Sequence, residues 1–402
     1  MKNIKKGMVI LLVFASSALF GQYSVLRGPS AGSSYTLPAN LNFTAQRSAH
    51  YEALVPDGVD GALLLAEMEQ RFEVYNRLFR FDPDTLQSAL RVRVFTNPRQ
   101  YRDYVESKLG VSRDGAVYLH YNSAENRELV VLKGSGESAP VFSHQAFIQF
   151  LRGFVNQSPA WIREGFAVYF STLVYNETEG RLEYEENLSW LDTVKRAGPA
   201  NPETILLADR RPGIPANFQG LSWALVSFFL ENGDLDYFRT LTDSFMVLDP
   251  AASALKNSEA VYQRLIRFTN LTSLSRAWQA YIAQKRTFTE LVDQGQKNYS
   301  EGNLVAAEAD FTAAGKIKSG HYAPLYYLAL IAYDRNDYAG AEALYKRALD
   351  AGAERALVQY ARGVNASAQG DPASAKAFLE EAARLAPALY RARADDLIRR
   401  LE

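Results

Sequence analysis

The sequence predicts an α+β domain followed by an all-α array of helical repeats. Up to about residue 140, segments with the period of a strand alternate with segments with the period of a helix. After about residue 287, small and aromatic residues recur at a fixed spacing of 34. A chain of 402 residues suffices for two or three domains. Its 48% hydrophobic content excludes a disordered or fibrous protein.

The N-terminus has the pattern of a secretory signal peptide over residues 1–22. Lysines precede an apolar run from Met8 to Ala15, and small residues follow it. The alternative is an uncleaved anchor, but this run is shorter than the ~20 residues that span a bilayer. Residues 23–47 are rich in Gly, Ser, Pro and Asn, which predicts a linker. We therefore expect an exported bacterial protein, periplasmic or secreted, with no membrane span after cleavage.

The first folded elements are expected from Ser48 onward. A strand over 48–55 precedes a helix whose apolar positions recur at spacings of three and four, namely Leu65, Met68, Phe72, Tyr75 and Phe79. Residues 90–96 alternate between apolar side chains and arginines, which predicts a strand with one buried and one solvated face. A helix after Asn97-Pro98 and strands over 115–121 and 128–133 complete a small sheet.

Helices are predicted from Pro140 to about residue 286. The segments 141–155 and 161–175 are apolar on most sides, which is typical of buried helices. A charged hairpin or loop follows at 177–187, and further helices complete a domain over 48–286.

The last third of the chain is a repeat. Gly302-Asn303, Asn336-Asp337 and Gly370-Asp371 lie 34 residues apart, and Ala307, Ala341 and Ala375 keep the same register. This period, with small residues where helices would cross, resembles the tetratricopeptide repeat. The resemblance implies a solenoid domain over 287–402 that ends in a charged cap helix and binds a protein or peptide.

Four tyrosines occupy matching first-helix positions of these repeats: Tyr299, Tyr326, Tyr333 and Tyr360. Aromatic side chains bind a peptide with little loss of conformational entropy, so we expect them to line a partner-binding face. The alternative is that some of them pack against the preceding domain.

Composition limits the chemistry that the chain can perform. The 44 basic and 45 acidic residues nearly cancel, which argues against nucleic-acid binding through bulk charge. The absence of cysteine excludes disulfides, thiol nucleophiles and cysteine-ligated metals. Imidazole chemistry is restricted to four histidines, which are His50, His120, His144 and His321.

Two segments of the middle domain resemble zinc peptidases in which an HExxH helix precedes a glutamate helix, the gluzincins. These are SHQAFIQFL (143–151) and PAWIREGFAVYF (159–170). The resemblance is closer to the peptidase-MA-like domains of exported bacterial proteins, and it covers residues 48–286. It implies that Glu164 occupies the third metal-ligand position. The segment Gln219–Ala224 resembles a helix that lines the family's cleft.

The HExxH pattern is incomplete in this chain. In that pattern, residues i and i+4 hold zinc from one helix face, and the glutamate at i+1 accepts a proton from zinc-bound water. His144 occupies the first ligand position, but Gln145 replaces the general base and Ile148 replaces the second ligand. A carboxamide does not accept this proton near neutral pH, and isoleucine has no lone pair.

Three interpretations remain open. The first is a peptidase fold without catalysis and without cofactor, in which His144 and Glu164 are vestigial ligands. The second is a zinc-dependent metallopeptidase with unusual ligands, in which His120 supplies the missing imidazole. The third is that the two segments are simply apolar core helices, and that their resemblance to the peptidases is due to chance or is too remote to matter. We favour the first, an exported pseudo-peptidase that recognises a protein or peptide partner through its repeats.

Overall fold

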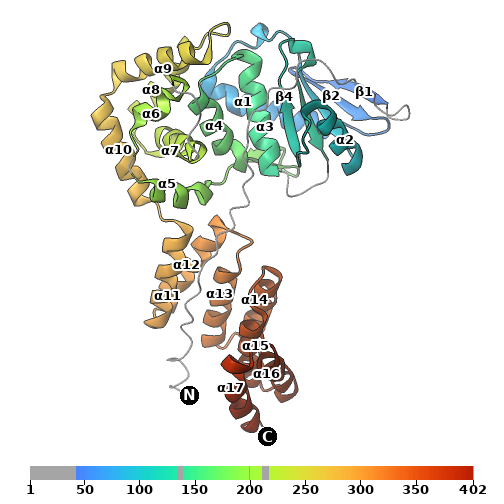
Figure 1. The fold of residues 1–402 in the computed structure, drawn as a ribbon, viewed down its shortest axis with the longest axis vertical. Helices are drawn as coiled ribbons and strands as arrows, with labels where there is room; N and C mark the ends of the chain where they lie inside the picture. Colours follow the sequence, from blue (N-terminus) through green and yellow to red (C-terminus); the bar gives the residue numbers. More distant parts are fainter. Residues whose placement is uncertain (1–41, 134–138, 199, 211–216, 402) are drawn as a thin grey trace.

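The computed structural model describes residues 42–133, 139–198, 200–210 and 217–401, and it is a mixed α+β structure (Figure 1). A small sheet with helices on its faces forms the N-terminal region, and helices alone form the C-terminal region. The predicted signal peptide and residues 23–41 of the predicted linker lie outside the described residues. Within the described ranges, no helix has the length and apolar character needed to cross a bilayer.

The sheet has five strands in the order β1-β2-β3-β5-β4. β2 and β3 are parallel, as are β3 and β5, while β1 and β4 pair antiparallel at the two edges. The strands are β1 Phe43–Arg47, β2 Tyr51–Pro56, β3 Leu90–Phe95, β4 Ala116–Leu119 and β5 Glu128–Leu132. The helices α1 Ala62–Phe79 and α2 Pro98–Leu109 connect β2 to β3 and β3 to β4.

The sheet begins earlier than the sequence predicts. Residues 43–47, assigned above to the linker, form β1, and Phe43 pairs with Pro56 of β2. Phe43 also packs edge-on against Phe95, with ring centroids 5.5 Å apart. A short edge strand with one large apolar residue shows little periodicity in the sequence. It becomes a strand through its pairing with β2.

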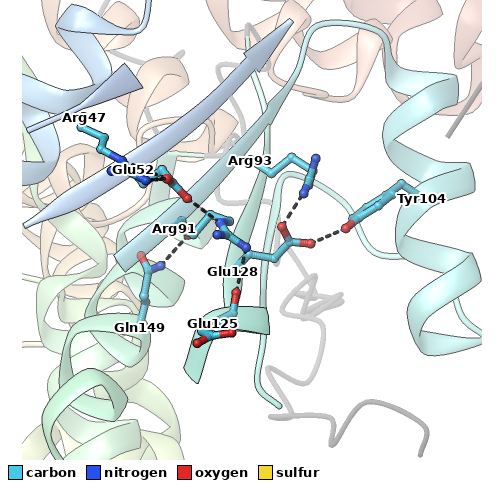
Figure 2. Close-up of polar contacts among 8 residues, drawn as sticks. All are labelled: Arg47, Glu52, Arg91, Arg93, Tyr104, Glu125, Glu128 and Gln149. Atoms are coloured by element: carbon cyan, nitrogen blue, oxygen red, sulfur yellow. Dashed lines mark hydrogen bonds and ion pairs between the residues drawn. The ribbon is translucent and has the colours of Figure 1, made fainter. Parts of the chain in front are cut away.

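Arg91 and Arg93 do not lie on a simply solvated face, because charged side chains cross the sheet in a row (Figure 2). Glu52 of β2 accepts from Arg47 of β1 at 2.7 Å and from Arg91 of β3 at 2.8 Å. Arg93 donates to Glu128 of β5 at 2.9 Å, and Tyr104 of α2 donates to the second oxygen of Glu128. Charges of alternating sign on neighbouring strands thus pair with one another across this face.

This row predicts a pH dependence of stability. Hydrogen bonds from Arg47 lower the pKa of Glu52 in the folded state. Burial acts in the opposite direction, and Arg91 lowers the pKa further. The stabilisation is therefore complete above the unfolded pKa of about 4.3 and is lost as pH falls through the lower folded value. We expect Glu52→Gln to be less stable at pH 7 and to lose less further stability on acidification. Urea unfolding from pH 7 to pH 3 measures this, and equal slopes for the two proteins would contradict it.

The opposite face of the sheet holds the aromatic core. All five predicted positions of the α1 face are buried. They meet α3 Ala139–Phe154 and α4 Ala160–Tyr169 in a continuous cluster of rings, of which Tyr75 and Phe147 lie 5.3 Å apart and Phe79 and Phe166 5.1 Å apart. The two helices that carry the candidate site are therefore fixed by packing from α1.

The remaining elements of the middle region surround α4. The helix predicted over 161–175 ends at Tyr169, and its last residues belong to the strand β6 Val174–Asn176. This strand pairs with β7 Arg181–Glu183, which lies in the predicted charged segment. The helices that follow are α5 Leu191–Ala197, α6 Pro202–Leu206, α7 Phe218–Glu231, α8 Leu235–Ser244, α9 Ala254–Phe268 and α10 Leu271–Gln284. α7 packs along α4, and both helices are almost entirely buried.

The C-terminal region consists of three consecutive helix pairs and a final helix. The pairs are α11 Phe288–Ser300 with α12 Leu304–Ile317, α13 Tyr322–Asp334 with α14 Tyr338–Asp350, and α15 Arg355–Gln369 with α16 Pro372–Leu385; α17 Pro387–Arg399 follows. α13 begins 34 residues after α11, and Ala307, Ala341 and Ala375 are fully buried. The arrangement is that of a helical repeat, with its small residues at the packed positions.

The two regions meet at the start of the repeats. Thr287 caps α11 in a reciprocal capping box with Glu290, which fixes where the repeat begins. Lys195 of α5 also donates to Glu290 at 2.8 Å, so one carboxylate joins the end of the first region to the first repeat helix.

Candidate functional site

The candidate site lies where α3 passes between β4 and α4. α3 contacts the β4 strand on one side and α4 on the other, and α4 in turn contacts α7. Gly165 allows the last of these approaches, because a Cβ at this position would lie 2.6 Å from the backbone oxygen of Ser222. The sequence segments that resemble the peptidase helices are thus neighbours in space.

His144 is a buried side chain near the carboxylate of Glu164. It is 1% exposed, and burial lowers the pKa of its imidazole to about 4. The negative charge of Glu164 opposes this shift, and the positive charge of Arg163 adds to it. The imidazole is therefore neutral at pH 7, and both residues of α4 lie close enough to act on it electrostatically.

Gln145 and Ile148 have structural roles at the positions that would supply the base and the second ligand. The Gln145 Oε1 accepts from the backbone N–H of Tyr118 on β4 at 3.0 Å, so the carboxamide ties α3 to the sheet. Ile148 is 1% exposed and belongs to the aromatic core. Neither side chain can activate water, because one is a neutral hydrogen-bond partner and the other is a hydrocarbon.

Both oxygens of Glu164 are engaged. Oε1 accepts from Nε of Arg163 at 3.0 Å, and Oε2 accepts from Nε2 of Gln219 on α7 at 2.9 Å. Gln219 begins the segment identified above by its resemblance to a cleft-lining helix. In this arrangement the carboxylate is neutralised by a guanidinium and anchored to α7, so a metal would have to compete with both contacts.

His120, the alternative zinc ligand, lies among positive charges. Its Nδ1 is 3.4 Å from the hydroxyl of Tyr118. Burial, followed by the charges of Arg152 and Arg127, lowers the pKa of this imidazole to about 3. A neutral imidazole can bind metal, but the surrounding guanidiniums repel a divalent cation. Among the described residues, no group of three or more His, Asp or Glu side chains is arranged to hold a metal ion.

The other two histidines lie elsewhere. His50 contacts Glu69 of α1 at 2.6 Å and stacks on Phe72. His321 caps α13 by accepting from the N–H of Ala323. Both imidazoles therefore stabilise local structure, His50 through its contacts with α1 and His321 at the start of α13.

The four repeat tyrosines fall into two groups. Tyr326 and Tyr360 are 4% and 7% exposed and pack inside the repeat, Tyr360 against Tyr390 of α17. Tyr299 and Tyr333 are half-buried and keep part of each ring at the surface. Of the four rings, those of Tyr299 and Tyr333 therefore reach the surface of the repeats, whereas the other two pack beneath it.

Two arginines near the candidate site, Arg152 and Arg127, were not predicted from the sequence. Arg152 lies two turns after His144 on α3, and Arg127 immediately precedes β5. The spacing contained a signal for Arg152, since residues 144, 148 and 152 share one helix face.

Comparison with known proteins gives no family for this chain, because neither models of known protein families nor curated proteins match it.

Proposed function

We propose that this is an exported, non-catalytic pseudo-peptidase that recognises a protein or peptide partner through its C-terminal repeats. The observation that carries the proposal is the state of α3: the positions for a general base and a second metal ligand hold Gln145, bound to β4, and Ile148, packed in the core. Neither a carboxamide nor a hydrocarbon side chain can deprotonate water at neutral pH.

The surroundings of Glu164 give further support. A carboxylate that serves as a catalytic metal ligand keeps its charge for the metal. Here the charge is shared with Arg163, and the second oxygen is bound to Gln219. We infer that this glutamate now joins α4 to α7 within a binding scaffold.

Restoring the HExxH pattern should create a zinc site. We expect wild-type protein to show neither peptide hydrolysis nor stoichiometric zinc binding. In the variant Gln145→Glu/Ile148→His the new imidazole lies one turn from His144 on the same face, so zinc affinity should rise at least about tenfold, equivalent to ~1.4 kcal/mol. Calorimetric zinc titration measures this, with Gln145→Glu alone as the control that adds a charge without an imidazole.

Circular dichroism must accompany that titration, because an imidazole at buried position 148 costs about 1–3 kcal/mol of folding free energy. Zinc bound by the wild type with accompanying peptidase activity would overturn the proposal in favour of the metallopeptidase. A folded double variant without zinc binding would show that the resemblance to the peptidase helices does not extend to their geometry.

The recognition half of the proposal is tested with peptides selected from a random display library against the full chain. We expect Tyr299→Ala/Tyr333→Ala to weaken a selected peptide by tenfold or more, because exposed tyrosines are frequent hot spots in interfaces. Tyr175→Ala, a half-exposed tyrosine of the β6–β7 hairpin, is the matched control. Fluorescence anisotropy gives the affinities, and equal losses for both variants would argue against a repeat-borne site.

A further inference from the structure

Arg152 extends the face of α3 that carries the candidate site. His144, Ile148 and Arg152 are spaced by four residues, so their side chains leave the helix on one side. Arg163 of α4 and Arg127, next to β5, both act electrostatically on Arg152. Three guanidiniums from three elements thus gather where α3, α4 and the sheet meet.

Arg152 is half-buried, and its Nε has no hydrogen-bond partner among the described residues. No carboxylate of those residues forms an ion pair with it, although the negative charge of Glu164 acts on it. Burial and the repulsive charge of Arg163 lower its pKa to about 10. Buried polar atoms are nearly always hydrogen-bonded, so the Nε is an exception, and the partial exposure of the residue leaves it open to a ligand.

The neighbouring arginines differ from Arg152 because each has partners. Arg127 donates from Nε to the backbone oxygen of Tyr121 at 2.7 Å and from Nη2 to Asn156 at 3.3 Å. Arg163 donates to Glu164. The Glu164 carboxylate therefore acts on both Arg163 and Arg152, and the neutral imidazole of His120 supplies no negative charge.

We propose that Arg152 and Arg163, with Arg127 behind them, form a binding site for an oxyanion that presents two acceptor oxygens, a carboxylate or a phosphate. Water can hydrate the exposed part of the Arg152 guanidinium, but an oxyanion also offsets the excess positive charge of the arginines and matches the planar guanidinium in bidentate geometry. The inference is independent of the proposed function, because it requires neither a peptide partner nor the loss of catalysis.

The test uses the full-length mature protein and three probes at constant ionic strength in a chloride background. The probes are inorganic phosphate, acetate, and a short peptide with a free C-terminal carboxylate, each followed by isothermal titration and by the shift in thermal unfolding. The same peptide with an amidated C-terminus is the control for the carboxylate. Binding of phosphate alone assigns a phosphate group, and loss of binding on amidation assigns a peptide carboxylate.

The deciding variant is Arg152→Gln, which keeps length and polarity but removes the charge. We expect the variant to bind the oxyanion at least tenfold more weakly and to unfold at a higher temperature than wild type in chloride alone, because repulsion among the arginines is reduced. Arg239→Gln, at an exposed arginine of α8, should leave both measurements unchanged.

Arg152→Lys is the second variant, to be used if Arg152→Gln does not fold. It keeps the positive charge but loses the planar guanidinium that binds two oxygens at once. We expect it to fold and to bind the oxyanion more weakly than wild type. Saturable binding in wild type that Arg152 variants lose, and Arg239→Gln retains, supports the site. No saturable binding of any probe by wild type, or equal binding by wild type and Arg152 variants, would overturn it.

Discussion

Gly165→Ala should destabilise the protein by about 3 kcal/mol, the upper end of the range for overpacking. The added methyl would lie 2.6 Å from the backbone oxygen of Ser222 and 2.9 Å from Cγ2 of Val226. The first neighbour is backbone of a buried helix, so α4 and α7 would have to separate. Such a separation would also pull Gln219 away from Glu164, which links this glycine to the candidate site.

Gly315→Ala is the matched control, since it makes the same substitution in α12 where there is space. The nearest atom to its added Cβ is 3.8 Å away, on Pro324. Alanine favours a helix over glycine by up to about 1 kcal/mol, so this variant should be slightly more stable than wild type. Urea unfolding followed by circular dichroism gives both values. A Gly165→Ala variant as stable as wild type would mean that α4 and α7 are not packed as described.

The fold could be predicted wherever side chains repeat with a period. The five buried positions of α1 and the 34-residue spacing of the helix pairs are periodic, and the structure has helices at both. β1 could not be predicted, because its five residues depend on pairing with β2 for their definition. The charged row was equally hidden: Arg91 and Glu52 are 39 residues apart, and only the sheet register brings them together.

The placement of His144, Gln145 and Ile148 on one helix was predicted from the sequence, but the partners of these side chains were not. The spacing of His144, Gln145 and Ile148 follows from the helix, so their shared neighbourhood is readable from sequence. The bond from Gln145 to the backbone of β4 and the bond from Gln219 to Glu164 join separate elements and carry no sequence signal. Arg152 was not predicted, because the peptidase pattern concerns only positions 144, 145 and 148 of this helix.

Glu164→Ala should be the most damaging single change at the site, with a loss of about 3–5 kcal/mol in the free energy of unfolding. Glu164 is 4% exposed, and its removal takes away the acceptor to which Nε of Arg163 and Nε2 of Gln219 donate. It also removes the negative charge that compensates part of the positive cluster, so repulsion among the guanidiniums grows. Glu259→Ala is the control, because Glu259 pairs with Arg210 at the surface at 2.9 Å and such pairs contribute about 0–1 kcal/mol.

A double-mutant cycle separates the charge from the packing in this prediction. If the loss arises mainly from an unpaired Arg163, then Arg163→Ala/Glu164→Ala should be less destabilised than Glu164→Ala, because the second substitution removes the charge that the first leaves unpaired. Equal or additive losses would instead mean that Glu164 acts through its packing and its bond to Gln219. Urea unfolding of wild type, the two single variants and the double variant at pH 7, at low and high salt, decides between these outcomes. Salt screens charges, so it should reduce the loss of unfolding free energy only where that loss is caused by charge.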